Sequence, residues 1–216
     1  MPQINFDDYS KIIKNKTILS HVTFQFDAGK IYGLYGRNGS GKTMILRAIA
    51  GLIFATEGKV SVDHQVIHQD IDFPESTGII IENTDLLPQY TAFYNLKLLA
   101  KINRVATDAD ILQALQDVGL AGHEDEKVKS FSLGMRQKLS IAQAIFEHPK
   151  LLLLDEPTNA LDEQTINQVR EILLRFKEAG GTIIIASHNK DDLNILADEI
   201  VKVEQHRIYK MEAAGY

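Results

Sequence analysis

Short apolar runs alternate with helix-like patterns along most of this chain. Residues 22–26 alternate between apolar and polar side chains, and the apolar run at 31–35 follows a polar turn, so both predict β-strands. Two further buried-strand patterns cover residues 150–154 and 183–186, and a helical pattern follows each of them. Near-continuous apolar strands separated by helices predict an α/β fold with a mainly parallel sheet.

Two parts of the chain depart from this alternation. Residues 4–26 and a hairpin over 58–68 predict an antiparallel β subdomain. From residue 91 to about 147 the helical period dominates, and one expected buried face comprises Ile111, Leu112, Leu115 and Val118. We therefore expect a single domain over residues 1–216, with a core at 1–85 and 148–216 and an inserted α-helical subdomain at about 86–147.

Composition narrows the classes of partner. Hydrophobic residues make up 44% of the 216 residues and charged residues 24%, which is ordinary for a globular protein. The net charge is −6 without a block of like charges, so nucleic acid is not expected as a partner. The absence of cysteine excludes disulfides, thiolate zinc sites and thiol nucleophiles. We expect a cytoplasmic protein, because we see neither a secretory signal nor an apolar run near the ~18 residues that span a bilayer.

A glycine-rich motif lies between the strand at 31–35 and a helix-like run at 44–52. Its sequence is Gly36-Arg37-Asn38-Gly39-Ser40-Gly41-Lys42-Thr43, which matches G-x-x-x-x-G-K-[ST]. Glycines let successive backbone N–H groups surround phosphate oxygens, and the following helix directs its positive end at the same anion. Lys42 should reach the β- and γ-phosphates, and Thr43 should offer its hydroxyl to Mg²⁺. The alternative is a glycine-rich turn with an exposed lysine.

Two acids follow the apolar strand at 151–154. Asp155 and Glu156 would lie at the carboxyl edge of the sheet, where α/β proteins bind their ligands. Asp155 would hold Mg²⁺, directly or through water, and Glu156 would orient and polarise an attacking water. The alternative is a solvated turn over residues 155–158.

These motifs together resemble the nucleotide-binding subunit of an ATP-binding-cassette (ABC) transporter. The resemblance rests on the phosphate loop, on Leu-Leu-Leu-Leu-Asp-Glu-Pro-Thr-Asn-Ala-Leu-Asp at 151–162 and on Ile-Ile-Ala-Ser-His at 184–188, in this order, and it covers nearly the whole chain. It implies a P-loop NTPase core that uses ATP and Mg²⁺. It also implies that residues 159–162, including Asp162, form the loop that links the two nucleotide sites of a dimer, and that His188 contacts the γ-phosphate.

The family's signature segment is present in altered form. Residues 131–137 read Phe-Ser-Leu-Gly-Met-Arg-Gln, where the usual pattern is Leu-Ser-Gly-Gly-Gln, so that Ser132 and Gly134 are retained. A helix is expected over 135–146, with the Ser132 hydroxyl and free N–H groups at its N-terminus holding the γ-phosphate bound by the other protomer. An ordinary serine cap would explain Ser132 alone.

Two more positions depart from the family pattern. Glu82 stands where a glutamine is usual, and we expect its carboxylate to approach Mg²⁺. Ile13 stands where an aromatic residue usually stacks on adenine, so that apolar contact replaces stacking there, or Tyr9 reaches the base instead. We therefore expect ATP and GTP to bind similarly. The Glu82 segment and Ser-Leu-Gly-Met are similar to the subgroup that drives drug, bacitracin and lantibiotic-type peptide exporters.

The resemblance therefore implies an ATP-hydrolysing motor. It would act as a homodimer, or as a heterodimer with a second ABC ATPase, and drive a separate integral-membrane permease from the cytoplasmic face of the cell membrane. Residues 84–99 would contact that permease, and the cargo stays open. The alternative is a regulatory ABC ATPase that acts on soluble partners. A degenerate, purely structural subunit would lack Lys42, Asp155, Glu156 or His188, and all four are present.

Overall fold

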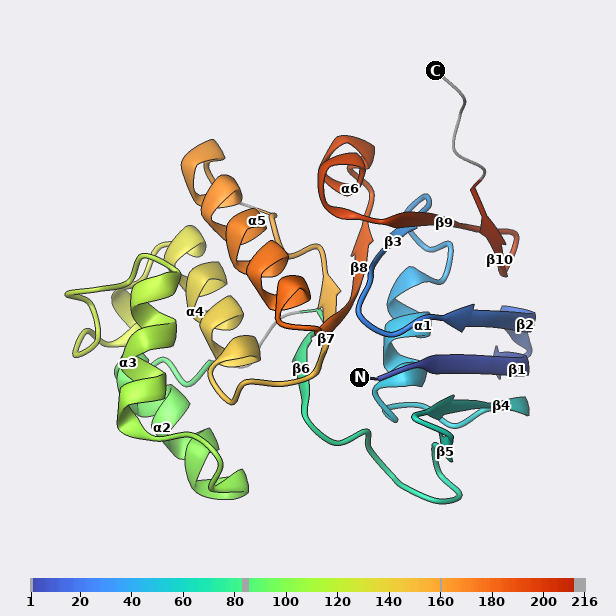
Figure 1. Cartoon of the computed structure of the whole chain (residues 1–216), viewed down its shortest axis with the longest axis horizontal. Helices are drawn as coiled ribbons and strands as arrows, with labels where there is room; N and C mark the ends of the chain where they lie inside the picture. The colour runs from blue at the N-terminus through green and yellow to red at the C-terminus, as the bar shows by residue number, and fades with distance from the viewer. Residues whose placement is uncertain (1, 83–85, 160, 212–216) are drawn as a thin grey trace.

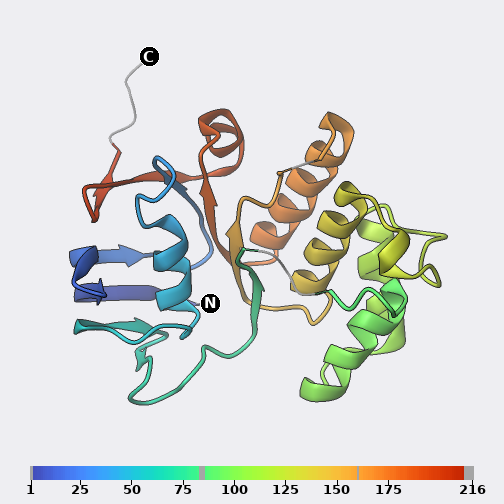
Figure 2. The same cartoon turned by 180° about the vertical axis from the view of Figure 1, so that it is seen from behind.

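The computed structural model describes residues 2–82, 86–159 and 161–211. Two sheets and a group of helices lie side by side in the molecule (Figures 1 and 2). The elements before the helical group are β1 (Ile4–Ile13), β2 (Lys16–Phe26), β3 (Ile31–Tyr35), α1 (Lys42–Ile49), β4 (Glu57–Val62), β5 (Gln65–Val66) and β6 (Thr77–Ile80). The helical group comprises α2 (Ala92–Asn103), α3 (Asp108–Asp117), the 3-10 helix η1 (Val128–Ser130) and α4 (Leu133–Ile145). The elements after it are β7 (Leu151–Asp155), α5 (Glu163–Glu178), β8 (Thr182–Ser187), α6 (Lys190–Leu196), β9 (Glu199–Glu204) and β10 (Arg207–Lys210).

The larger sheet is mainly parallel, as the strand pattern predicts. Its order is β10-β9-β3-β8-β7-β6, and only the β9–β10 pair is antiparallel. All of β8 and the first four residues of β7 are buried, because α1 and α5 cover opposite faces of these strands (Figure 1). The order makes β3, β8 and β7 neighbours, so their carboxyl ends meet at one edge.

The smaller sheet is antiparallel, with the order β2-β1-β4-β5. Its hairpin between β4 and β5 turns at Asp63 and His64, whose φ angles are 48° and 68°. The inner face of β1 supplies core residues, and Tyr9 among them is only 1% exposed, with its ring 5.4 Å from that of Phe6. The possibility that Tyr9 reaches a bound base is therefore wrong, because its ring lies in the core.

The helices α2, α3 and α4 form a layer of their own beyond β6 and β7 (Figure 1). Ile111 and Leu115 are fully buried and Val118 is 2% exposed, as predicted, whereas Leu112 is 46% exposed. The expected buried face was too wide, because α3 packs along one narrow stripe and Leu112 lies beside that stripe. No helix in the described ranges is both long and apolar enough to cross a bilayer. We propose that the single domain consists of a core at 1–85 and 148–216 and a helical subdomain at about 86–147.

Candidate nucleotide site

The loop between β3 and α1 has a backbone that only certain residues allow. Gly41 precedes α1 with φ 111° and ψ 3°, in the left-handed region that glycine adopts without steric cost. A Cβ on Gly36 would lie 2.4 Å from the carbonyl oxygen of Val203, so this position has no room for a side chain. The first N–H groups of a helix have no partner within it, and no side chain among the described residues caps α1.

The interior of this loop is suited to an anion. The Lys42 side chain is buried, and its Nζ donates to the carbonyl oxygens of Gly36 (2.7 Å) and Arg37 (3.3 Å). Ser40 Oγ is buried and has no hydrogen-bond partner among the described residues. A buried hydroxyl without a partner is costly, and a phosphate oxygen inside the loop would satisfy it. Arg37, Asn38 and Gly39 are exposed along the outside of the loop.

Two candidate magnesium ligands touch each other beside the loop. Thr43 Oγ1 donates to Asp155 Oδ2 over 2.6 Å, which joins the start of α1 to the end of β7. Burial raises the pKa of the Asp155 carboxyl above its ordinary value, although the hydrogen bond from Thr43 opposes this shift. The described residues contain no cluster of three or more acids or histidines that could hold a metal by itself. One hydroxyl and one carboxylate nevertheless fit Mg²⁺, which usually takes its other ligands from water and substrate phosphates.

Glu156 and His188 meet at the same edge of the sheet. Glu156 has φ 49°, and its N–H donates to the carbonyl oxygen of Ala186 over 2.8 Å. Its Oε1 accepts from the His188 N–H at 3.0 Å and lies 2.8 Å from His188 Nδ1. Its Oε2 accepts a longer hydrogen bond, 3.3 Å, from Ser187 Oγ. Because β7 and β8 are neighbours, the acid after one strand and the histidine after the other form a pair.

Glu82 lies near this site but has another partner. Its Oε2 is 2.7 Å from Arg47 Nη2 in the last turn of α1. Glu82 follows β6, whose Ile80 lies opposite Leu154 of β7, and its charge is a minor influence that raises the pKa of Asp155. The role of Glu82 as a magnesium ligand therefore stays a prediction.

Comparison with known proteins agrees with the resemblance drawn from the motifs. The family described as ABC transporter matches residues 19–159 of the chain. This chain belongs to the ABC transporter family. It is 52% identical over 207 residues to the uncharacterized ABC transporter ATP-binding protein YybJ of Bacillus subtilis (strain 168), covering 96% of this chain and 95% of that protein. It is also 36% identical to the lantibiotic transport ATP-binding protein SrtF of Streptococcus pyogenes, covering 95% and 88%, and 36% identical to the bacitracin transport ATP-binding protein BcrA of Enterococcus faecalis, covering 91% and 65%.

Solved structures share the fold of this ABC ATPase subunit. The dimeric post-hydrolysis state of the ATP-binding cassette MJ0796, bound to ADP and Pi, matches with a TM-score of 0.87 at 22% identity and covers 99% of this chain and 100% of that one. At this identity the match establishes the fold. The expected P-loop core with a parallel sheet, an antiparallel sheet and added helices is thus confirmed.

The signature residues of this ABC subunit lie away from its own phosphate loop. Figure 1 shows α4 and α1 on opposite sides of β7 and β8. Ser132 caps α4, which begins at Leu133 rather than at 135, and its Oγ accepts from the Met135 N–H at 3.1 Å. One chain therefore does not bring Ser132 or Gly134 to the nucleotide that its own loop would bind.

Asp162 and Ile13, which the sequence also predicted for the nucleotide site, lie outside the cluster of Thr43, Asp155, Glu156 and His188. Asp162 caps α5, with its Oδ1 accepting from the Thr165 N–H at 2.8 Å, and this bond lowers the pKa of its carboxyl. Ile13 ends β1 and is 39% exposed, beside a turn formed by Lys14 and Asn15. Ile13 thus offers an apolar surface, and its contact with a base stays a prediction.

Sequence reasoning missed several residues that shape the site. Arg47 follows Thr43 by one helical turn, so the i,i+4 spacing could have placed both on one face of α1. Ser187 directly precedes His188 at a strand end, which could have marked it as a partner for Glu156. Gln137, whose Nε2 donates to the Pro157 carbonyl over 2.9 Å, and Asp192 join segments far apart in the sequence, and no local signal marks them.

Proposed function

We propose that this ABC ATPase subunit binds Mg²⁺-ATP, dimerises with a second ABC ATPase subunit around two nucleotides, and hydrolyses ATP to drive a separate membrane permease that exports drugs or peptides. One observation carries the catalytic part of the proposal. The phosphate loop, Asp155, Glu156 and His188 follow three neighbouring strands and meet at one edge of the sheet. Such a meeting of an anion loop, a metal ligand and a water-orienting acid is what phosphoryl transfer to water requires.

The loop residues bind and orient the phosphates. Lys42 Nζ gives up its carbonyl partners and donates to the β- and γ-phosphate oxygens, as do the N–H groups at the start of α1. Thr43 and Asp155 would hold Mg²⁺, which neutralises phosphate charge as it develops. Ser40 Oγ donates to a phosphate oxygen and so gains the partner that it lacks.

Glu156 has one oxygen suited to a water molecule. Its Oε1 is engaged twice by His188, whereas its Oε2 accepts, among the described residues, only the 3.3 Å bond from Ser187. Oε2 therefore orients the attacking water and takes its proton. With His188 Nδ1 donating to Glu156, a neutral ring presents Nε2 as an acceptor. The ring consequently donates to the γ-phosphate only when it is protonated or has turned away from Glu156.

Dimerisation completes each site. Ser132, Gly134 and the first N–H groups of α4 bind the γ-phosphate held by the other protomer, and Asp162 lies in the loop that joins the two sites. The separation of α4 from α1 within one chain supports this arrangement (Figure 1). The partner is either a second copy of this chain or a related ABC ATPase subunit.

The permease contacts the region of residues 84–99, of which 86–99 lie in the described part. Leu87, Tyr90 and Tyr94 are each 39% exposed there, and the two tyrosine rings are 5.0 Å apart. A hollow of about 880 Å³ between β6 and the helical layer is bordered by the exposed side chains of Phe73, Ile102 and Val105. The exposed apolar side chains of Leu87, Tyr90 and Tyr94 suit contact with another protein. The subunit would then sit on the cytoplasmic face of the cell membrane.

The relatives named for lantibiotic and bacitracin transport support drug or peptide export. The experiment is a pull-down of tagged Glu156→Gln protein from detergent-solubilised native membranes with ATP and Mg²⁺. This variant should keep the ATP-bound dimer intact by removing the carboxylate that takes the proton from water.

Recovery of a multi-span membrane protein, lost when Lys42→Ala is added, would support the motor and identify the permease. Recovery of soluble proteins alone would reject the transport role and favour the regulatory ATPase.

A further inference from the structure

An ion pair between a buried aspartate and a half-buried arginine lies behind the catalytic edge. Asp192, in the first turn of α6, is only 6% exposed, and its Oδ1 pairs with Arg170 Nη2 of α5. Its Oδ2 accepts from Thr158 Oγ1 over 3.0 Å. Burying two charges is costly, and an apolar pair of similar size often stabilises a fold as well or better. Stability alone therefore does not explain the Asp192–Arg170 pair.

The Asp192–Arg170 pair is connected to the segments that follow Glu156 and His188. Thr158 lies two residues after Glu156, and Asp192 lies four residues after His188. The Thr158–Asp192 hydrogen bond thus ties the turn after the catalytic acid to the helix after the histidine. Arg170 fixes the same carboxylate to the long helix α5.

A second set of hydrogen bonds closes the connection. Ser187 Oγ donates to Glu156 and accepts from the Asn189 N–H over 3.0 Å. Asn189 Oδ1 in turn accepts from the Asp191 and Asp192 N–H groups, at 3.0 and 3.4 Å. Glu156, Ser187, Asn189, Asp192 and Thr158 therefore form a closed ring of covalent and hydrogen-bonded links.

The backbone of Glu156, which belongs to this ring, has a conformation that needs support. Glu156 adopts φ 49°, a left-handed conformation that a residue with a side chain keeps only when its surroundings fix it. We propose that Asp192, fixed by Arg170, is a positioning residue for ATP hydrolysis, which holds the turn after Glu156 so that Oε2 stays aligned with the water. This inference rests on the proposed ATPase activity and adds residues that do not touch the nucleotide.

The first test removes one hydrogen bond. Thr158→Val keeps the shape of the side chain and leaves the Asp192–Arg170 pair intact, and Thr158→Ser keeps the hydroxyl. In the full chain, Thr158→Val should lower kcat for ATP by roughly tenfold to a hundredfold, the range expected for a small misplacement of a catalytic group. ATP affinity should stay within about twofold, and Thr158→Ser should restore most of kcat.

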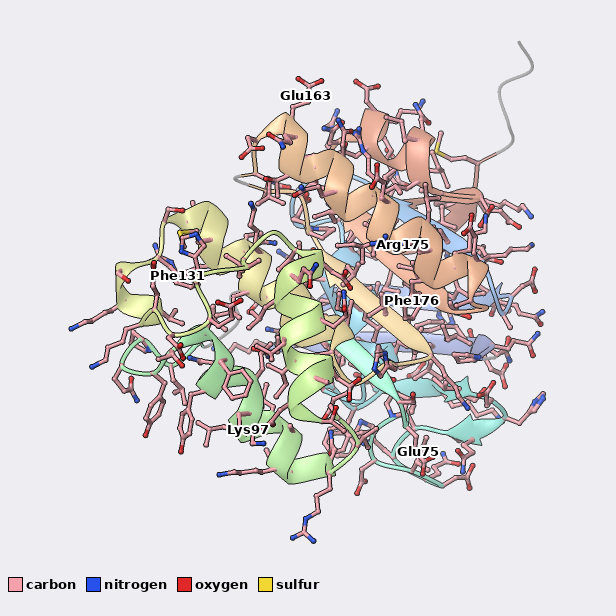
Figure 3. All side chains as sticks on the ribbon, turned by 60° about the vertical axis from the view of Figure 1, so that its left-hand side comes forward. Glu75, Lys97, Phe131, Glu163, Arg175 and Phe176 are labelled. Atoms are coloured by element: carbon pink, nitrogen blue, oxygen red, sulfur yellow. The ribbon has the colours of Figure 1, made fainter. Side chains whose placement is uncertain are left out.

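The second test separates positioning from stability. Asp192→Asn leaves the half-buried Arg170 without its charge partner and should lower both the melting temperature and kcat. The double variant Arg170→Met/Asp192→Leu replaces the ion pair by apolar side chains and should recover the melting temperature but not kcat. Arg175→Met, on the exposed part of the same helix (Figure 3), is the control for losing a charge from α5.

The outcomes are distinct. If wild-type protein shows no ATP turnover under any condition, the proposed function fails. If it turns over ATP and Thr158→Val keeps wild-type kcat, or if the double variant recovers kcat together with stability, Asp192 and Arg170 are structural only and the inference is overturned.

Discussion

The contact between β6 and α4 predicts that an alanine at Gly78 will displace the helix that carries the signature segment. A Cβ built on Gly78 would lie 1.9 Å from the carbonyl oxygen of Ala144 and 2.7 Å from Leu152 Cδ2. The nearest atom belongs to the backbone of α4, so no side-chain rotation can relieve the overlap. Strand and helix must separate by about 1.1 Å for this contact to reach even 3.0 Å.

The expected magnitude follows from two opposing effects. Overpacking of a well-packed interior costs typically about 1–3 kcal/mol. Replacing glycine by alanine also reduces the entropy of the unfolded chain, which stabilises the fold by roughly 0.4–1 kcal/mol. The overlap wins, with a net loss of about 1–2 kcal/mol. For a chain of this size such a loss lowers the melting temperature by roughly 2–8 °C.

Thermal unfolding of the nucleotide-free chain measures this loss, and hydrogen exchange locates it. Amides of α4 (Leu133–Ile145) should exchange faster in Gly78→Ala, because the helix has lost its close contact with the sheet. Gly122→Ala is the control, since a Cβ there meets nothing within 4 Å and only its left-handed backbone is strained. Gly78→Ala protein with wild-type melting and wild-type exchange in α4 would refute the close approach of helix and strand.

Four further predictions concern the nucleotide site. Glu156→Gln should lower the rate of phosphate release by about a hundredfold or more while ATP binding persists, because an amide cannot take a proton from water; an unchanged rate would reject its role. Glu82→Gln should weaken the Mg²⁺ dependence of ATP binding. Arg47→Met should strengthen it, because this change frees Glu82 from its ion pair. Identical Mg²⁺ titrations for the wild type and both variants would show that Glu82 takes no part in metal binding. Asp155→Asn should raise the melting temperature of the nucleotide-free protein near pH 8 and less near pH 4, close to the ordinary pKa of the carboxyl. The reason is that the folded-state pKa of Asp155 is raised, so its ionisation disfavours folding only as the pH rises through that pKa, and a difference that grows toward low pH would contradict this sign. ATP and GTP should bind within a few-fold of each other by equilibrium titration, because Ile13 gives apolar contact without stacking, and strong adenine selectivity would argue against that contact.

The sequence was most informative where a function depends on neighbouring residues. The phosphate loop could be predicted because its glycines, lysine and threonine are consecutive and their spacing has a direct physical reason. Asp155, Glu156 and His188 could be assigned to strand ends because apolar runs at 151–154 and 183–186 precede them. Their meeting at one edge required the strand order, which depends on packing between distant segments.

Side-chain partners were the least predictable feature. Arg170 and Asp192 are 22 residues apart and lie on different helices, so neither periodicity nor spacing relates them. The Leu112 prediction was wrong for a related reason, because a helical stripe of apolar residues does not reveal how much of it the neighbouring helices cover. Tyr9 illustrates the same limit, since the sequence does not tell whether an aromatic residue in a strand faces a bound base or the core.

The cap at Ser132 bears on how a single hydroxyl can serve both the helix and a nucleotide. Its oxygen accepts from the Met135 N–H, which uses a lone pair and leaves the O–H proton free. A phosphate oxygen needs a donor, so the cap and phosphate binding do not compete. Alanine at this position would remove both interactions, whereas asparagine, also a good cap, would keep the helix start and alter the donor. Comparing ATP-dependent dimerisation of Ser132→Ala and Ser132→Asn with their melting temperatures would therefore separate the two contributions. Equal dimerisation by wild type and both variants would show that the partner's phosphate is held by the N–H groups of α4 without the hydroxyl.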